Sequence, residues 1–291
     1  MSLKTQEILF SSGDKYIGAI NSQNLFEGEG LYKFSNGSSY KGSFFAGIYH
    51  GKGIYTNPLI PVVYEGTFNE GVLEGKCRVL YKGGIEYQGF LLRNKRNGKG
   101  VLRVPDMKLR YEGEFNEDLF EGKGKIYIDE KLRFDGMFIK GKLEGFGKEI
   151  AEDFEYEGDF KAGLKQGKGT MRHRNGDIYE GGFRNDEKEG IGVYKFQEGG
   201  CYEGEFKEDF FEGKGIFKNE EIEIRGFFMK GKLEGEAEVI RKEGEIMKGE
   251  WEAGEKNGRI RVEMTRNGKP GIYEGDFKKD VEIKRVFVKK M

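Results

Sequence analysis

The chain of 291 residues carries 50 basic and 51 acidic side chains, a formal net charge of -1. Because it lacks a basic excess, it does not resemble a nucleic-acid-binding protein. Glycine is abundant, at 48 residues, and proline is rare, at 4, which excludes collagen and proline-rich linkers. Apolar residues make up 36% and charged residues 35%, a balance that favours buried apolar stripes over a thick globular core.

The start of the chain, residues 1–16, contains neither a signal-like segment nor an apolar run long enough to span a bilayer. We therefore expect a soluble protein of the cytoplasm. Cys77 and Cys201 lie too far apart to form a disulfide framework or a metal-site spacing. His50 and His173 have no cysteine or acidic cluster nearby in the sequence, so neither a metal nor a cofactor is expected.

An aromatic-x-Gly-x-aromatic motif recurs along the chain and defines a repeat of 22 to 26 residues. Its opening residues are Tyr16, Tyr40, Tyr64, Tyr87, Tyr111, Phe134, Tyr156, Tyr179, Tyr202, Ile224, Met247 and Tyr273. A Gly-x-Gly pair begins 11 residues after the opening residue in the second to eleventh repeats, with Cys77, Ala237 and Ile260 replacing the second glycine in three of them. Seven residues after the opening residue, the second to twelfth repeats hold only Gly, Asn or Asp.

Each repeat is predicted to form a β-hairpin. Tyr111, Gly113 and Phe115 alternate with two glutamates, and this period of two predicts a strand with rings on one face and carboxylates on the other. A turn is expected next, because Gly, Asn and Asp tolerate a positive φ angle. The Gly-x-Gly pair then starts the second strand. Because glycine leaves bare backbone, we expect aromatic rings to lie across it once per repeat.

The links between hairpins contain their own turn signals. These are the pairs Asn36-Gly37, Gly83-Gly84, Asn175-Gly176 and Gly199-Gly200. All four prolines are expected in the links and outside the strands, where they would remove a ladder hydrogen bond. They are Pro58, Pro61, Pro105 and Pro270.

The fold expected from these patterns is all-β: an elongated, single-layer, twisted antiparallel meander of stacked hairpins. Residues 1–15 are expected to cap the N-terminal end and residues 16–277 to form about twelve hairpins. Residues 278–291 are expected to form a basic C-terminal edge, where lysines discourage edge-to-edge aggregation.

The unit Tyr-Glu-Gly-Glu-Phe, a short turn, and Glu-Gly-Lys-Gly resembles the MORN repeat, and the resemblance covers about residues 16–277. It implies an extended hairpin array with an aromatic-lined groove and no catalytic activity. MORN proteins are associated with cilia and flagella, including radial spokes and other axonemal parts, with the protist cytoskeleton and with membrane junctions. The resemblance therefore implies a structural, protein-binding scaffold in a cytoskeletal assembly, with the ciliary axoneme as the leading location.

The aromatic stripe is the candidate partner-binding surface, because a single-layer sheet has no second layer to cover its apolar face. Either the rings cover one another or a partner covers them, and we favour the partner. An amphipathic helix or an extended segment suits such a groove, and a second copy of the chain is another candidate. The residues are Tyr40, Phe44, Tyr64, Phe68, Tyr87, Tyr111, Phe115, Phe134, Phe138, Tyr156, Phe160, Tyr179, Phe183, Tyr202, Phe206, Phe228, Trp251, Tyr273 and Phe277.

A peripheral membrane module that binds anionic phospholipids or tethers a membrane to the cytoskeleton is the alternative function. It is motivated by the basic segment 93–100 and by the lysines from Lys278 to Lys290, although acidic residues interleave with both. An enzyme is ranked third among the alternatives, because it needs a convergent polar pocket and a thin meander scarcely provides one. No catalytic, cofactor-binding or metal-binding residue is therefore assigned.

Overall fold

The computed structural model describes residues 5–266 and 269–290. These residues form an all-β chain of 25 strands in one open antiparallel meander, as the sequence predicts. Two short 3₁₀ turns, η1 (Lys82–Gly84) and η2 (Pro105–Met107), lie in the links between hairpins. The chain divides into two compact units, Met1–Glu144 and Gly145–Met291, named below the N-terminal and C-terminal units.

The strands of the N-terminal unit are β1 (Thr5–Leu9), β2 (Lys15–Ile20), β3 (Phe26–Lys33), β4 (Ser39–Phe45), β5 (Ile48–Asn57), β6 (Val62–Asn69), β7 (Val72–Tyr81), β8 (Glu86–Leu92), β9 (Lys95–Val104), β10 (Leu109–Asn116), β11 (Leu119–Ile128) and β12 (Lys131–Ile139). The division falls within β13 (Lys142–Ile150). The remaining strands are β14 (Phe154–Lys161), β15 (Leu164–His173), β16 (Ile178–Arg184), β17 (Glu187–Lys195), β18 (Cys201–Lys207), β19 (Phe210–Lys218), β20 (Ile222–Met229), β21 (Lys232–Arg241), β22 (Ile246–Glu252), β23 (Glu255–Arg266), β24 (Lys269–Lys278) and β25 (Val281–Lys290).

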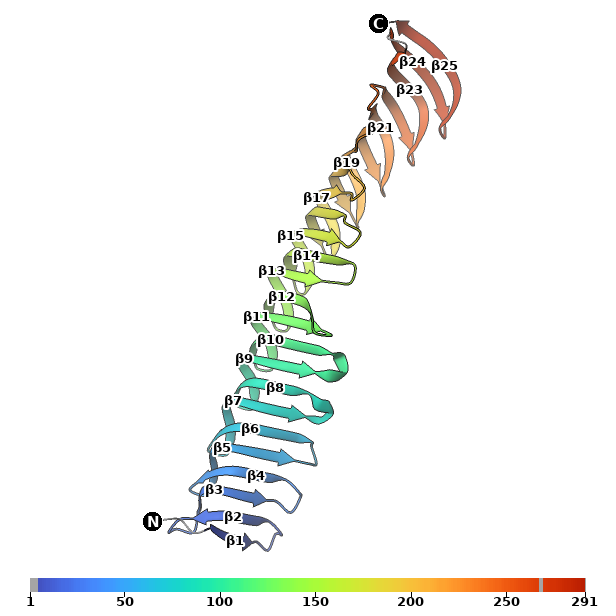
Figure 1. Cartoon of the computed structure of the whole chain (residues 1–291). Helices are drawn as coiled ribbons and strands as arrows, with labels where there is room; N and C mark the ends of the chain where they lie inside the picture. Colours follow the sequence, from blue (N-terminus) through green and yellow to red (C-terminus); the bar gives the residue numbers. More distant parts are fainter. Residues whose placement is uncertain (1–4, 267–268, 291) are drawn as a thin grey trace. The chain divides into compact units, whose positions relative to one another are not determined.

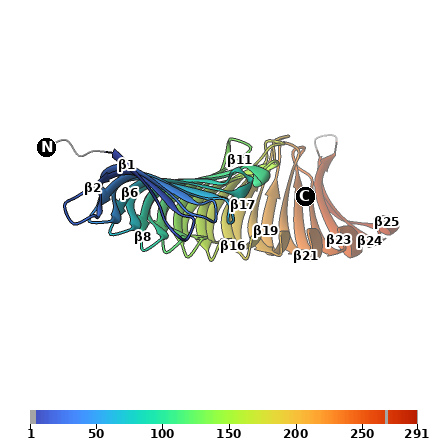
Figure 2. The same ribbon diagram turned by 90° about the horizontal axis from the view of Figure 1, so that it is seen from below.

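Within each unit, the strands follow one another in chain order (Figure 1). In the N-terminal unit, for example, β10 pairs with β9 on one side and β11 on the other. Figure 2 shows the strands of this unit fanned against one another, the twist expected of a β-sheet. The even-numbered strand of each hairpin carries the opening residue, and the following odd-numbered strand carries the Gly-x-Gly segment.

The predicted turn positions adopt the predicted backbone conformation. The residue seven after the opening residue has a positive φ in the second to twelfth repeats, for example 73° at Asp118 and 84° at Gly47, and in the first repeat the turn residue is Asn24, with a φ of 60°. The residue before it usually has a positive φ as well, 47° at Glu117 and 48° at Ala46. Two successive left-handed residues form the type I′ turn, whose twist matches that of the flanking strands. The phase of the repeat is therefore confirmed.

A β-bulge follows each turn. In β11, Gly124 pairs with Gly113, but the next pair is Glu121 with Glu114, which leaves Gly122 and Lys123 as extra residues facing β10. Gly122 has a φ of 65°, a conformation that favours glycine. The first glycine of Gly-x-Gly therefore forms the bulge, whereas the second continues the ladder.

The opening tyrosine lies across two glycines and completes the bulge. A Cβ added to Gly113 or Gly124 would overlap the ring or hydroxyl of Tyr111. The Tyr111 hydroxyl donates a hydrogen bond to the carbonyl of Glu114, beside the register shift, at 2.9 Å. Because a bulge disrupts the ladder locally, this hydroxyl replaces a backbone donor. The predicted packing of rings over glycine is confirmed.

Six further tyrosines make the same hydrogen bond, to the carbonyl three residues after each ring, at 2.7 to 3.1 Å. They are Tyr16, Tyr40, Tyr87, Tyr156, Tyr179 and Tyr202, and each is fully buried. Burial raises the pKa of Tyr40 to about 12, because the phenolate would lose its hydration.

The repeat with cysteine in the second glycine position packs differently. The Cβ of Cys77 lies against Gly66, and Tyr64 stays half-exposed instead of lying across the pair. Cys77 is buried, as expected for a small packing residue, and burial raises the pKa of its thiol to about 11. The opening tyrosine therefore lies buried across the pair only where both positions of the pair are glycine.

Neighbouring hairpins are joined by the residue nine positions after the opening residue, here called the stacking position. In three repeats this residue is aromatic and stacks on the opening tyrosine, as Phe120 does on Tyr111, with ring centroids 3.7 Å apart. In the first repeat, which has one extra residue, Phe26 takes this place ten residues after Tyr16. In four other repeats the stacking position holds a cation that pairs with the turn aspartate of the next hairpin. Those pairs are Arg96–Asp118, Lys165–Asp186, Lys188–Asp209 and Lys256–Asp280.

The turn residue and the preceding stacking position match throughout the sequence. Where the stacking position holds an aromatic residue or leucine, the next turn residue is Gly or Asn; where it holds a cation, that residue is Asp. The aspartate also accepts the backbone N–H of the cation, as Asp186 does from Lys165 at 2.8 Å. Sequence reasoning explained the turn residues by φ alone and missed this pairing.

The ends of the chain contain strands rather than irregular segments. β1 lies within residues 1–15 and pairs with β2, and β25 lies within residues 278–291 and pairs with β24. Residues 1–4 and 291 of these segments lie outside the described residues. The expectation that all four prolines avoid strands is wrong for Pro270, the second residue of β24.

Candidate functional site

The aromatic stripe predicted as a partner groove is largely buried within the sheet itself. Fifteen of its nineteen residues are buried, with exposed fractions of 0 to 6%. They are Tyr40, Phe44, Phe68, Tyr87, Tyr111, Phe115, Phe138, Tyr156, Phe160, Tyr179, Phe183, Tyr202, Phe206, Phe228 and Trp251. The other four, Tyr64, Phe134, Tyr273 and Phe277, are half-buried.

These rings cover one another across repeats. Tyr40 meets Phe44 and Phe68 edge-on, each with ring centroids 5.1 Å apart, and Tyr202 contacts Phe206 and Phe228 in the same way. Edge-to-face contacts are a favoured arrangement of aromatic pairs. Of the two alternatives drawn from the sequence, the structure shows mutual covering, and these rings form the core that holds the hairpins together.

The opposite face of the sheet carries the candidate site. Along each hairpin, the two glycines that lie beneath the tyrosine have no side chain, and their pairs form a line across the strands, here called the glycine seam. In the N-terminal unit the seam runs through Gly89, Gly100, Gly113 and Gly124. Side chains on both sides of the seam enclose a trough of about 730 Å³.

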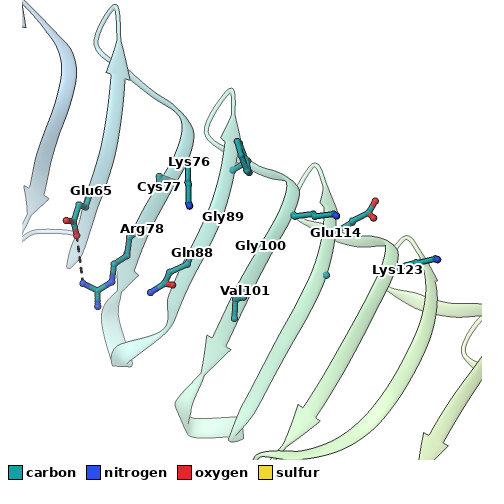
Figure 3. A pocket seen from close by; sticks show the side chains of 13 residues that line it. Glu65, Lys76, Cys77, Arg78, Gln88, Gly89, Gly100, Val101, Glu114 and Lys123 are labelled. Carbon is teal, nitrogen blue, oxygen red and sulfur yellow. Dashed lines mark ion pairs between the residues drawn. The ribbon is translucent and has the colours of Figure 1, made fainter.

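The trough has two walls, which Figure 3 shows on either side of the glycine positions. One wall contains Arg78, Gln88 and Val101, together with Glu65, which lies 3.8 Å from the Arg78 guanidinium. The other wall contains the residues Lys76, Phe90, Lys99, Glu114 and Lys123. The floor is backbone, closed on the far side by the buried tyrosines.

Lys76, Lys99 and Lys123, called below the trough lysines, occupy equivalent positions one residue after the bulge glycine. All three are exposed, and none forms an ion pair within the described part of the chain. In β11 the bulge leaves Lys123 without a partner residue in β10, whereas Lys99 lies opposite Glu114 of β10 and Lys76 lies opposite Phe90 of β8.

On β7 and β11 a cation two residues further along the strand is paired, whereas β9 has Val101 at this position. Arg78 contacts Glu86 at 2.6 Å, and Lys125 contacts Asp135 at 3.0 Å. On these two strands one cation therefore pairs with a carboxylate of a neighbouring strand, and the trough lysine does not.

One of the two trough carboxylates is paired, and the other lies over the bulge. Glu65 faces Arg78, and Glu114 folds over the bulge, where a Cβ on Gly122 would lie 2.6 Å from its Oε2 atom. In the equivalent positions of the C-terminal unit, Asp159 and Glu205 accept bulge N–H groups at 3.2 Å. With four cations against two carboxylates, the trough carries a net positive charge.

The basic segment that motivated a membrane role is divided by the structure. Arg93 and Asn94 form the type I′ turn, Lys95 pairs with Glu117 at 3.3 Å, and Arg96 pairs with Asp118 at 3.0 Å. Two of the four cations in this segment therefore join hairpins.

The C-terminal unit has troughs on the corresponding face with different walls. One, of about 730 Å³, is lined by Phe146 and Ile191 with a single lysine, Lys168. The next, of about 600 Å³, is lined by Ile191, Ile216, Phe227 and Lys214. Each contains two carboxylates, so these troughs are more apolar than the trough of the N-terminal unit and carry no positive excess.

The described residues show no constellation suited to metal binding: no cluster of three or more His, Cys, Asp or Glu side chains is present among them. Burial lowers the pKa of His173. None of the described residues forms a helix with the length and apolar character needed to span a membrane.

Comparison with known sequences identifies the repeat. The sequence model described as MORN repeat matches nine segments, at residues 22–39, 40–58, 64–85, 87–106, 111–129, 134–153, 156–178, 179–201 and 202–219. By this measure the expectation of about twelve repeats is slightly high. A search of curated proteins found no match. MORN repeats are known as non-catalytic modules that mediate protein or membrane-lipid interactions. The matched segments cover more than half of the residues, and the chain belongs to the MORN repeat family.

Proposed function

We propose that this chain is a non-enzymatic, protein-binding scaffold of a cytoskeletal assembly, and that the assembly is ciliary. The observation that carries the scaffold role is the division of labour between the two faces of the sheet. The rings of one face are buried against each other, whereas the other face presents open troughs with unpaired lysines. The ciliary location rests on the association of MORN proteins with axonemes.

Cross-linking mass spectrometry on isolated axonemes tests this function. The trough lysines are exposed amines, so an amine-reactive reagent should join them to a small set of partner proteins present in stoichiometric amount. Recovery of the chain only as a free monomer, without inter-protein cross-links, would contradict a scaffold. Cross-links in a cytoskeletal fraction that lacks axonemes would retain the scaffold and reject the ciliary location.

A peripheral membrane module is the second candidate, because the trough of the N-terminal unit places an excess of positive charge on an exposed face. Co-sedimentation with phosphatidylserine vesicles tests it. Salt-sensitive binding that is lost on phosphatidylcholine vesicles would favour the membrane role, and no sedimentation at low salt would reject it.

A further inference from the structure

The spacing of the trough lysines specifies the shape of a ligand. They lie on β7, β9 and β11, so each is two strands from the next. At ~4.8 Å per strand, the separation is about 9.6 Å along the trough. A ligand that meets all three must present a complementary charge with the same period on one side.

The backbone conformations available to a peptide differ in this period. A polyproline II segment repeats every three residues and rises ~3.1 Å per residue, so one side recurs every ~9.3 Å. An α-helix returns to one side after seven residues, or ~10.5 Å, and falls about 2 Å out of step over the two lysine intervals. A β-strand repeats every ~6.6 Å, so it misses the middle lysine and returns to the third one only after three repeats, at ~19.8 Å.

The size of the trough also favours an extended ligand. Strands β7 to β11 span about 19 Å, so a volume of about 730 Å³ gives a mean cross-section of roughly 40 Å². An α-helix 10–12 Å across needs ~90 Å² and would rest on top of the walls. A polyproline II chain has no internal hydrogen bonds, and its backbone stays solvated in a trough that is open on one side.

The unpaired lysines determine the ligand's charge. Because Arg78 is satisfied by Glu65 and Glu86, the three ammonium ions of the trough lysines remain against one carboxylate, that of Glu114, and the trough keeps an excess of positive charge. We infer that the trough of the N-terminal unit binds an acidic segment of a partner protein in polyproline II conformation, with Asp or Glu at every third position. This inference rests on the proposed scaffold function and specifies the chemistry of its partner.

The test uses the full chain and a fluorescent synthetic peptide of about five Glu-Pro-Pro repeats, with a peptide of equal composition whose glutamates are grouped at one end. We expect the periodic peptide to bind with an affinity that falls as salt is raised, and to bind more tightly than the grouped peptide. Equal binding of the two peptides, or no binding of the periodic one, would overturn the inference.

Charge removal locates the binding. The combined change Lys76→Ser, Lys99→Ser and Lys123→Ser should weaken binding of the periodic peptide by about threefold or more, because three exposed ion pairs are lost. The matched control, Lys168→Ser with Lys214→Ser, removes the equivalent unpaired lysines of the C-terminal unit and should leave the affinity unchanged. Circular dichroism checks that both variants fold. A triple variant that is folded and binds within twofold of the parent would contradict the site.

Two further outcomes separate this inference from the scaffold function. If phosphatidylserine vesicles bind through the trough lysines and the periodic peptide does not compete, the ligand is a membrane and the inference fails. If the peptide fails to bind while native cross-links to partner proteins persist in the triple variant, the scaffold stands and its partner binds elsewhere.

Discussion

The trough of the N-terminal unit and the troughs of the C-terminal unit share a backbone and differ in their walls. Both have a glycine seam as a floor, with buried tyrosines such as Tyr111 and Tyr202 behind it. In the first, successive bulges present lysines; in the second, Ile191 takes the middle bulge position between Lys168 and Lys214. The comparison shows that the aromatic face maintains the fold, so the side chains of the trough face can vary from one unit to the other.

Alkaline pH should produce the largest effect, and it should affect both units because both depend on buried tyrosines. Unfolded tyrosines lose their protons near pH 10, whereas burial holds the pKa of Tyr40 and Tyr111 at about 12. Stability is therefore fully present below pH 10 and is lost as the pH rises from 10 to 12.

Circular dichroism and tyrosinate absorbance recorded together should change in this window, and hydrogen exchange should show both units opening. Titration of the rings near pH 10 with the sheet intact would show that they are not core residues in solution.

Blocking the seam should be the most disruptive mutation and should cost the same in either unit. A Cβ at Gly124 would overlap the hydroxyl of Tyr111, and one at Gly215 that of Tyr202. Gly124→Val and Gly215→Val should each lower the free energy of unfolding by about 3 kcal/mol, because ring and backbone cannot both stay in place.

Urea unfolding measures both variants. The control is Gly231→Asn, at a turn position where other repeats carry Asn or Asp, and it should change stability by about 0.5 kcal/mol or less. A large loss in one unit only would break the claim that the two share their structural face.

The cation–aspartate pairs should differ between the units according to burial. The Lys165 side chain is 8% exposed and pairs with Asp186 and Glu149, whereas Arg96 is 22% exposed beside Asp118. Asp186→Asn should cost about 2 kcal/mol, because a buried ammonium loses a partner, and Asp118→Asn about 1 kcal/mol or less.

Asparagine tolerates the positive φ of both turns, so backbone strain contributes equally to the two variants. Chemical denaturation at low and high salt measures the difference. Equal losses would mean that burial does not set the strength of these links.

Ile191→Lys should have a smaller effect, and it sharpens the comparison directly. It completes a row of three lysines, with Lys168 and Lys214, on alternate strands of the C-terminal unit. The variant should bind a second Glu-Pro-Pro peptide with an affinity within about tenfold of the first site. Titration calorimetry gives the stoichiometry, and Ile191→Ser is the control; a stoichiometry of one would show that lysine spacing alone is insufficient.

The sequence was sufficient for the fold because the repeat constrains each position many times. The turn position was read from Gly, Asn and Asp recurring at one offset, and the packing of rings over glycine from their alternation. The strand position of Pro270 was not predicted, because a proline is tolerated near the start of a strand and the repeat does not define where that strand begins.

The candidate site was harder to predict. Whether an aromatic stripe is exposed or buried depends on how closely the rings of successive hairpins approach one another. The alternation of residues in the sequence does not give that distance. The free state of Lys123 depends on a bulge, which shifts register by two residues and leaves this lysine without a partner residue in β10. The Arg96–Asp118 pairing did leave a sequence signal, because the two positions vary together from repeat to repeat.

The backbone-to-backbone hydrogen bonds that the turns make to the preceding hairpin have a direction along the chain. The turn N–H of Asp118 donates to the carbonyl of Arg96, that of Asp209 to Lys188 and that of Gly231 to Phe211. In each case the later hairpin supplies the donor and the earlier one the acceptor. During synthesis the acceptor therefore emerges from the ribosome first, and every new hairpin meets a completed template. Within either unit, removing whole hairpins from the C-terminal side therefore leaves all of these turn hydrogen bonds intact between the remaining hairpins.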